Sequence, residues 1–532
     1  MNGYQALGQI RPLPLNKSYS REEILEKIKQ TEWDFASKNE DDDFHTDILF
    51  IRTATQYMQA YIGDAHQKAL LVYKGYCGEF YFEKKNTARI SKKIIRKLIE
   101  HPQWREKFND EIYQSASALM NVYEGIEKEQ LKKMTLPQLK ELYSNQMEAH
   151  LKLYEKCWPA EIIQVPEVGM TEYLLDYLME KGKIDSQGAE NIYYYLTRSM
   201  KDSVYVEEEK ALMEIAEILL KSGEMERVKE APIKYLRTYL SKDIIESIEK
   251  IIEKYGYLGY HGYGTRRPYS LEEYLKRIQE YVIYPEKMEK QKEIWGQNLI
   301  LSEIECQIMG EIDETHHALF KIYGELAVSK AYRRLAQLKN FYYLDELLKQ
   351  MALRLDLTES HLRFMLPEEI IKLCEGERSF LQNLQMAERR FGMVYLYENE
   401  AESIVLMNPE EVIEAIHLEE KGEEKLSVLT GRAACVGIRK GIAKVIERNS
   451  DMENFKDGDI LVSLEADPDL IPIMRRAGAI VTDQGGITCH AAVIAREFNI
   501  PCVIGTIHAT KCIQDGDILM VDAYKGEVTI ER

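Results

Sequence analysis

The segment of residues 478–505, GAIVTDQGGITCHAAVIAREFNIPCVIG, constrains the fold of this chain more than any other. Residues 479–482 form a short β-branched and apolar run, which predicts a buried strand. The pair Gly485-Gly486 then predicts a turn, because glycine adopts backbone angles that other residues resist. Residues 489–498 predict a short helix, and residues 502–504 predict a second buried strand. The segment therefore predicts a strand, a glycine turn, a helix and a strand in succession.

His490 lies in the first turn of this predicted helix, for which Thr488 is the expected N-cap. Unpaired backbone N–H groups and the helix dipole at such a position favour an anion. An imidazole at this place is therefore suited to carry a phosphoryl group. The alternative is that His490 is a structural or surface histidine, which is the commoner role of a lone histidine near a helix start.

The same residues resemble a known family. The pattern Thr-Asp-x-Gly-Gly-x-Thr-Cys-His-Ala-Ala-x-Ile-Ala-Arg-Glu, followed by Ile-Pro-x-Val-x-Gly-Thr, resembles the phosphohistidine (mobile or swivelling) domain of PEP-utilising enzymes. That group includes PEP synthase, pyruvate phosphate dikinase and the rifampin phosphotransferases. The resemblance covers roughly the last hundred residues, where residues 431–445 and 457–462 are similar to its opening strands and residues 515–528 to its closing hairpin. One departure is Cys435-Val436-Gly437, where relatives usually have Ser-Pro-Gly.

The resemblance implies that His490 is the catalytic phosphoryl carrier. It also implies a set of neighbours that support the phosphohistidine, namely Gly485, Gly486, Thr488, Cys489 and Arg496. Arg496 does not share a helix face with His490, so helix packing or docking is an open alternative for it. We interpret Cys489 as a packing or hydrogen-bonding residue and not as a nucleophile.

The composition of the chain changes near residues 421–425. Before this point leucine, isoleucine and tyrosine recur every three or four residues, which is typical of amphipathic helices. After it, short β-rich runs alternate with Gly-Asp turns. The sequence therefore predicts a multidomain fold, with a mostly α-helical acceptor or docking region at residues 1–424, as one domain or two. A C-terminal α/β (β/β/α) swivelling phosphohistidine domain is predicted at residues 425–532.

One stretch interrupts the helical region. Residues 69–82 alternate Val, Tyr and Phe around Gly75 and Gly78, which predicts either a β-hairpin or an irregular helix break. Elsewhere the helical pattern is long and regular, with helices predicted at residues 136–157, 186–201, 234–255 and 311–355.

Residues 255–269 concentrate glycine, tyrosine and arginine between two predicted helices. Such a loop lets a ligand approach closely and offers cationic and aromatic groups. It resembles a loop in the helical substrate domain of rifampin phosphotransferase-like enzymes. In that role His261 is a general base for an acceptor hydroxyl, and Arg266 and Arg267 bind phosphate oxygens. The alternative is a helix-connecting loop with exposed basic residues. The candidate acceptor-binding residues are Tyr260, His261, Tyr263, Arg266 and Arg267.

Charge and cysteine usage exclude several classes of protein. The formal net charge of −19 argues against nucleic-acid and anionic-membrane partners. We find no apolar run of about 18 residues and no signal-peptide pattern, so we expect a cytoplasmic protein. The 8 cysteines include no Cys-x-x-Cys pair, which argues against zinc and disulfides. The pair His316-His317 has no matching carboxylate spacing, so we predict no metal site.

The first 430 or so residues show no Gly-x-x-x-x-Gly-Lys-Ser/Thr loop and no alternating strands and helices of a PEP-binding barrel. We therefore expect a separate ATP-grasp partner that binds ATP and Mg²⁺, with PEP as the second candidate donor. The expected function is a dikinase-like phosphotransferase that passes a phosphoryl group to a small-molecule acceptor on the helical region. Two alternatives stay open: a phosphocarrier or regulatory protein phosphorylated on His490, and a degenerate relative that binds a ligand without catalysis.

Overall fold

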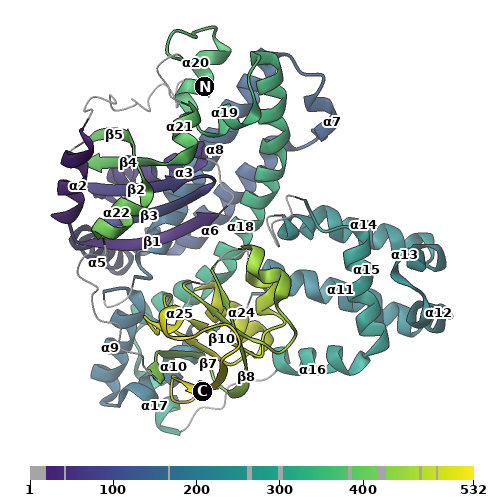
Figure 1. Cartoon of the computed structure of the whole chain (residues 1–532). Helices are drawn as coiled ribbons and strands as arrows, with labels where there is room; N and C mark the ends of the chain where they lie inside the picture. Colours follow the sequence, from purple (N-terminus) through teal and green to yellow (C-terminus); the bar gives the residue numbers. More distant parts are fainter. Residues whose placement is uncertain are drawn as a thin grey trace. The chain divides into compact units, whose positions relative to one another are not determined.

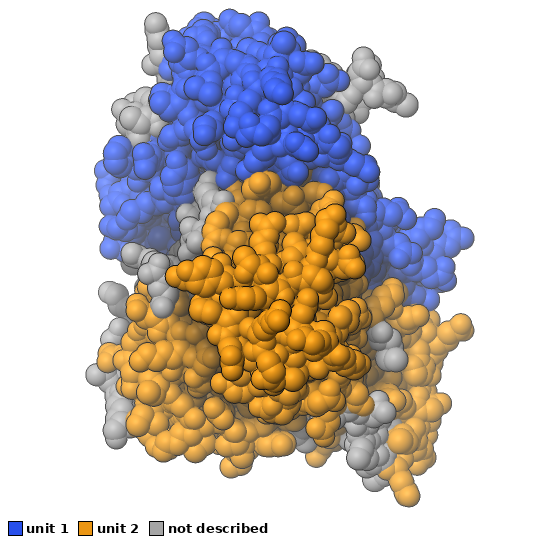
Figure 2. Space-filling model, turned by 90° about the vertical axis from the view of Figure 1, so that its right-hand side faces the viewer, with its two compact units in different colours: residues 1–170, 343–424 blue, residues 171–342, 425–532 orange. Residues whose placement is uncertain are grey.

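The computed structural model describes most of the 532 residues. The described ranges are residues 19–40, 44–165, 168–199, 201–260, 267–296, 303–381, 386–398, 400–416, 427–447, 449–465, 470–486 and 489–531. The chain divides into two compact units, each made of two separate chain segments (Figure 2). Unit 1 comprises residues 1–170 and 343–424, and unit 2 comprises residues 171–342 and 425–532.

Unit 1 contains a five-stranded antiparallel sheet in the order β1-β3-β2-β4-β5. Its strands are β1 (Trp33–Glu40), β2 (Lys68–Lys74), β3 (Cys77–Glu83), β4 (Met393–Glu398) and β5 (Ala401–Leu406). Of the two alternatives predicted for residues 69–82, β2 and β3 confirm the β-hairpin. The mostly helical character predicted for residues 1–424 is confirmed for the described residues, but the strands β1, β4 and β5 were not predicted. All residues of β4 are buried, so it lacks the alternation that reveals a half-exposed strand.

Helices surround the sheet of unit 1 (Figure 1). They are α2 (Arg21–Lys29), α3 (Phe44–Arg52), the π-helix η1 (Thr53–Tyr57), α4 (Met58–Ile62), α5 (Lys84–Glu100), α6 (Pro102–Met120), η2 (Asn121–Tyr123), α7 (Lys128–Leu131), α8 (Leu136–Ile162), α19 (Glu359–Arg363), α20 (Pro367–Cys374), α21 (Met386–Phe391) and α22 (Pro409–Ile416). Ile24 of α2 shares a core with Leu70 on one face of the sheet. Phe50 of α3 packs edge-on against Phe80 and Trp158 on the other face. Successive strand side chains point to opposite faces, so both faces are apolar.

The first segment of unit 2 is helical. Its helices are α9 (Met170–Gly182), α10 (Ser186–Leu196), α11 (Val204–Leu220), α12 (Met225–Glu230), α13 (Ile233–Leu236), η3 (Arg237–Tyr239), α14 (Lys242–Tyr255), η4 (Gly256–Gly259), α15 (Leu271–Ile283), α16 (Pro285–Gly296), α17 (Glu303–Glu311) and α18 (Glu314–Leu355), whose last residues belong to unit 1. The single helix predicted at 234–255 is wrong, because Leu240 is extended and Ser241 begins α14 as its N-cap. The helix predicted at 186–201 ends at Leu196.

The second segment of unit 2 forms an eight-stranded sheet in the order β6-β13-β12-β8-β9-β10-β11-β7. Its strands are β6 (Val428–Thr430), β7 (Arg432–Cys435), β8 (Ile438–Ile446), β9 (Ile460–Ser463), β10 (Ala479–Thr482), β11 (Cys502–Ile504), β12 (Ile518–Asp522) and β13 (Glu527–Glu531). Strands β8 to β11 are parallel, and all other neighbours are antiparallel. Its helices are η7 (Asn449–Asn454), α23 (Ile471–Met474), α24 (His490–Phe498) and α25 (Ala509–Cys512). The predicted succession of strand, turn, helix and strand is confirmed by β10, α24 and β11.

The predicted domain boundary between residues 424 and 425 lies in residues 417–426, outside the described part of the chain, and stays a prediction. The structure adds that the C-terminal segment forms one compact unit with the helices of residues 171–342. No helix in the described ranges combines the length and the apolar character that a membrane crossing requires.

Candidate active site

The site is built where β10 ends and α24 begins. β10 is fully buried between the parallel strands β9 and β11, which fixes the position of its carboxyl end. His490 is the first residue of α24, and the N-cap is Cys489. The predicted N-cap Thr488 is therefore one residue too early, and its structure is outside the described residues. The side chain of His490 is also outside the described part, so the structure defines its backbone position at a helix N-terminus.

The glycine turn before α24 requires its first glycine. Gly485 has φ +113°, a conformation that L side chains rarely adopt. A Cβ at Gly485 would also meet the Cys489 Sγ atom at 2.9 Å. The carbonyl of Gly486 accepts a hydrogen bond from the Cys489 N–H at 2.8 Å. Together these contacts set the direction in which the chain enters α24.

Asp483 fixes the carboxyl end of β10 to the segment after β11. Its buried carboxylate accepts hydrogen bonds from the Thr506 hydroxyl at 2.9 Å and the Thr510 N–H at 3.0 Å. It also accepts from the Ala509 N–H at the start of α25. Our set of site residues missed Asp483, although it belongs to the Thr-Asp-x-Gly-Gly pattern that marked the site. Its role is to hold the turn in place.

Cys489 and Arg496 both have structural contacts. Burial raises the pKa of the Cys489 thiol, which keeps it protonated and unreactive beside the turn. Arg496 donates from Nε to the Ala434 carbonyl at 3.0 Å, and its guanidinium lies 4.7 Å from the ring centre of Tyr194 on α10. These contacts correspond to the packing or docking role that was the alternative for Arg496.

The predicted acceptor loop is described in part. His261, Tyr263 and Arg266 are outside the described residues. Tyr260 is 1% exposed and meets Tyr342 at 5.8 Å between ring centres. Arg267 is exposed and forms an ion pair with Glu273 at 2.7 Å. The described part of the loop therefore places Tyr260 in an aromatic core and Arg267 in a local ion pair.

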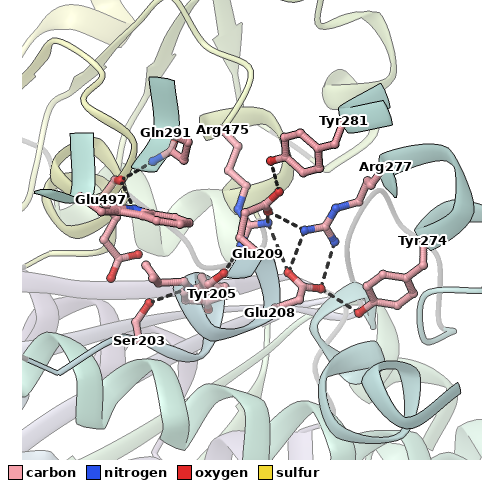
Figure 3. Close-up of polar contacts among 12 residues, drawn as sticks. Ser203, Tyr205, Glu208, Glu209, Tyr274, Arg277, Tyr281, Gln291, Arg475 and Glu497 are labelled. Atoms are coloured by element: carbon pink, nitrogen blue, oxygen red, sulfur yellow. Dashed lines mark hydrogen bonds and ion pairs between the residues drawn. The ribbon is translucent and has the colours of Figure 1, made fainter. Parts of the chain in front are cut away.

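Other contacts of unit 2 link its helices with the region around α23 and α24. Figure 3 shows Arg475, which follows α23, directed toward Glu208 and Glu209 on α11. The Glu497 carbonyl of α24 accepts hydrogen bonds from Gln291 and Trp295 of α16. A pocket adjoins the contact between Arg475 and Glu208. Its lining residues are Tyr205, Glu208, Leu258, Tyr269, Leu338, Ile471, Pro472 and Arg475. Leu258 and Tyr269 belong to the stretch 255–269 that the sequence analysis singled out, whereas Glu208 and Arg475 were not among the predicted site residues.

His316 has protein partners on both ring nitrogens. Nδ1 lies 2.7 Å from Asp313 Oδ2, and Nε2 lies 2.9 Å from the Tyr173 hydroxyl. The imidazole stacks on Tyr177 with ring centres 3.6 Å apart. Hydrogen bonds from His316 and Tyr177 outweigh partial burial and lower the pKa of Asp313 to about 2. Among the described residues, no group of three His, Cys, Asp or Glu is arranged to hold a metal ion.

Comparison with known proteins gives one family. The sequence profile described as "PEP-utilising enzyme, mobile domain" matches residues 455–526. Phosphoenolpyruvate synthase of Pyrococcus furiosus is 47% identical over 109 residues, which cover 20% of this chain and 13% of that protein. The Pseudomonas aeruginosa enzyme of the same name is 42% identical over 136 residues, 26% of this chain and 17% of that protein. The phosphoenolpyruvate synthase of Deinococcus radiodurans is 44% identical over 115 residues, which cover 22% of this chain and 14% of that protein.

This chain thus spans less than a fifth of the length of each of these relatives. The matched region contains β9, β10, α24, β11 and β12, together with the glycine turn and the start of α24 at His490. Through this region, the chain is similar to the mobile domain of PEP-utilising enzymes.

Proposed function

We propose that this chain is the acceptor-side component of a dikinase-like phosphotransferase. His490 carries a phosphoryl group from ATP to a small molecule bound by the helical part of the chain. ATP and Mg²⁺ are held by a separate ATP-grasp protein. The proposal is supported above all by the backbone position of His490, which begins α24 directly after the Gly485-Gly486 turn within the matched mobile domain.

The transfer takes two steps. First, an imidazole nitrogen of His490 attacks phosphorus, an N–P bond forms, and the P–O bond to the nucleotide breaks. Second, an acceptor oxygen attacks the same phosphorus, the N–P bond breaks, and the acceptor proton passes to a base. The N–H groups that point out of the first turn of α24 and the helix dipole favour the phosphoryl charge in the intermediate. The covalent carrier divides one transfer into two easier reactions.

PEP is the second candidate donor. The relatives that match the mobile domain are named phosphoenolpyruvate synthases, so exchange of the phosphoryl group with PEP has a specific observation in its favour. In that case the N–P bond on His490 forms as the P–O bond to the enol oxygen of PEP breaks. In the reverse direction the N–P bond breaks as this P–O bond forms. The carrier residue is identical for both donors, which allows one experiment to separate them.

The test is phosphoryl labelling of the full chain. We would incubate it with β- or γ-labelled ATP, with and without a candidate ATP-grasp protein, and separately with labelled PEP. We expect acid-labile label that depends on the partner and is lost in His490→Ala. The exposed His317 offers a matched control, since His317→Ala should retain the label.

Each outcome of this labelling decides one point. Label from PEP alone makes PEP the donor, and label from ATP without a partner places a nucleotide site on this chain. Label that stays on the protein with no loss to any small molecule supports the phosphocarrier role. Absence of label under every condition contradicts a carrier role for His490.

A further inference from the structure

Four charged side chains join the mobile domain to the helices of unit 2 (Figure 3). They are Glu208 and Glu209 of α11, Arg277 of α15, and Arg475 just after α23, and we call them the docking cluster. The first three belong to the helical segment, whereas Arg475 belongs to the mobile domain. The cluster is therefore completed by two different parts of the chain.

The helical segment supplies both carboxylates and only one of the two cations. Glu208 and Glu209 are 1% and 5% exposed. Arg277 contacts both oxygens of Glu208, at 3.0 and 3.1 Å, and one oxygen of Glu209 at 2.7 Å. The hydroxyls of Tyr274 and Tyr281 donate to Glu208 and Glu209 respectively. Without the mobile domain, these residues hold two buried negative charges against one positive charge.

Arg475 supplies the missing positive charge. Its Nη1 lies 3.3 Å from Glu208 Oε2 and 3.1 Å from Glu209 Oε2, and its Nη2 donates to the Tyr205 carbonyl at 3.4 Å. The centre of the Phe498 ring, in the same domain, lies 5.0 Å from the Arg475 guanidinium, which is within the range of a cation–π contact. With Arg475 present, two carboxylates face two guanidinium groups, and the cluster is neutral.

The acidity of the carboxyl groups reflects this balance. Burial by itself raises the pKa of Glu208 and Glu209, but Arg277 and Arg475 outweigh it and lower the pKa of both. Both groups are therefore charged, and removal of either cation leaves an uncompensated buried charge, which is strongly unfavourable.

A second contact holds the end of α24. The last carbonyls of a helix have no partner within the helix. The Glu497 carbonyl, one residue before the end of α24, instead accepts from Trp295 Nε1 at 2.9 Å and from Gln291 Nε2 at 3.0 Å. These donors come from α16, so the helix that begins with His490 is also attached at its other end to the helical segment.

We propose that the docking cluster is the charge-balanced contact that seats the mobile domain on the helical segment, with Arg475 as its positioning residue. When the mobile domain leaves, Arg475 leaves with it, and the helical segment retains an excess negative charge that draws the domain back. The strength of this contact sets how often the carrier domain is released. The inference rests on the proposed function in one respect, namely that a carrier must leave the acceptor to be recharged.

Hydrogen–deuterium exchange of the full chain tests the proposal. We expect Arg475→Met to raise exchange several-fold in peptides from α11, α16 and α23. The hairpin β12–β13 should exchange as in the unsubstituted protein, because the fold of the mobile domain itself is kept. Arg475→Lys keeps the positive charge but lacks the planar guanidinium that contacts both carboxylates and the Tyr205 carbonyl. It should therefore give an intermediate effect.

The neighbouring arginine is a matched control. Arg476 pairs with Asp457 at 2.5 Å and donates to the Phe455 carbonyl, and both partners lie within the mobile domain. Arg476→Met should therefore leave exchange in α11 and α16 unchanged. Equal effects of the two arginine variants would contradict the proposal, because they would reflect a general loss of stability.

A double-mutant cycle tests the charge balance itself. Glu209→Gln removes one carboxylate, so Arg475→Met should have a clearly smaller effect in the Glu209→Gln background than alone. Additive effects would overturn the proposal, as would unchanged exchange at α11 in Arg475→Met. None of these measurements involves phosphoryl transfer, so a failure of His490 labelling and a failure of the docking cluster are observed separately.

Discussion

At the scale of single residues, the turn before His490 depends on backbone geometry that few side chains tolerate. Gly485 combines a positive φ with close approach to the Cys489 thiol, and Asp483 anchors the preceding strand end through four hydrogen bonds. The backbone position of His490 is therefore determined by contacts that its own side chain does not make. Substitutions at these residues should change the site through its geometry.

Gly485→Ala should destabilise the mobile domain and reduce labelling of His490. The added Cβ is strained at φ +113° and meets Cys489 Sγ at 2.9 Å, so we expect a loss of about 2 kcal/mol or more. Gly516→Ala is the matched control, because Gly516 has φ +93° but no atom within 4 Å of its Cβ position. Thermal unfolding and label yield would be measured for both, and equal losses would refute a special role of the contact with Cys489.

Asp483→Asn should loosen the edge of the sheet next to α24. The amide cannot accept from all the donors that the buried carboxylate satisfies, so we expect a cost of about 1–3 kcal/mol in the free energy of unfolding. Asp457→Asn, at a side chain that is 78% exposed, should change stability by less than about 0.5 kcal/mol. Chemical denaturation of both variants measures the difference, and a neutral Asp483→Asn would contradict the anchoring role.

At the scale of elements, α24 carries a titratable group near its end. Burial raises the pKa of Glu497 to about 7 from an ordinary value of 4.5, while Ser203 and Arg475 lower it and Asp202 raises it. The folded unit 2 therefore favours the protonated carboxyl group of Glu497. The stability that Glu497 contributes is complete below about pH 4.5 and is lost as the pH rises through 7.

Glu497→Gln should remove this pH dependence. In the unsubstituted protein we expect unit 2 to lose stability from about pH 4.5 to 7, by on the order of 3 kcal/mol at most, since each unit of pKa corresponds to about 1.4 kcal/mol. Thermal unfolding across this range compares Glu497→Gln with Glu293→Gln, at an exposed position of α16. An unchanged pH profile in Glu497→Gln would exclude Glu497 as the responsible group.

At the scale of the whole molecule, each unit is assembled from two distant segments of the chain. In unit 1 the buried Arg52 of α3 joins them: it contacts both carboxylate oxygens of Glu402 at 2.8 Å, and those of Glu368 at 2.8 and 3.0 Å. Glu402 is 0% exposed, and Arg52 lies against both of its carboxylate oxygens. The ion pairs of Arg52 with Glu402 and Glu368 thus fix the second segment of unit 1 to the first.

Arg52→Met should destabilise unit 1 selectively. Removal of one partner from a buried ion pair costs about 3–5 kcal/mol, because the remaining charge is left without compensation. Arg21→Met, which removes an exposed pair with Glu411, should cost less than about 1 kcal/mol. Calorimetry should show a lower transition temperature for unit 1 and an unchanged one for unit 2. A shift of both transitions would show that the two units unfold together.

The sequence by itself determined the strands, turn and helix around His490 and their family. These are local features: β-branched runs, adjacent glycines and a helix stop are encoded within about 30 residues of one another. The same locality explains why the hairpin β2–β3 was among the predicted alternatives.

Only the tertiary structure decided how distant segments combine. Strand β4 pairs with β2 across more than 300 residues, with Leu70 opposite Leu396, and its continuous burial hides it from periodicity. Arg475 meets Glu208 at a separation of 267 residues. A lone arginine or glutamate carries no local sign of its partner, because charge compensation in a buried cluster is a property of the assembled unit. The strand, turn and helix around His490 were therefore readable in the sequence, whereas the contact of Arg475 with Glu208 and Glu209 was not.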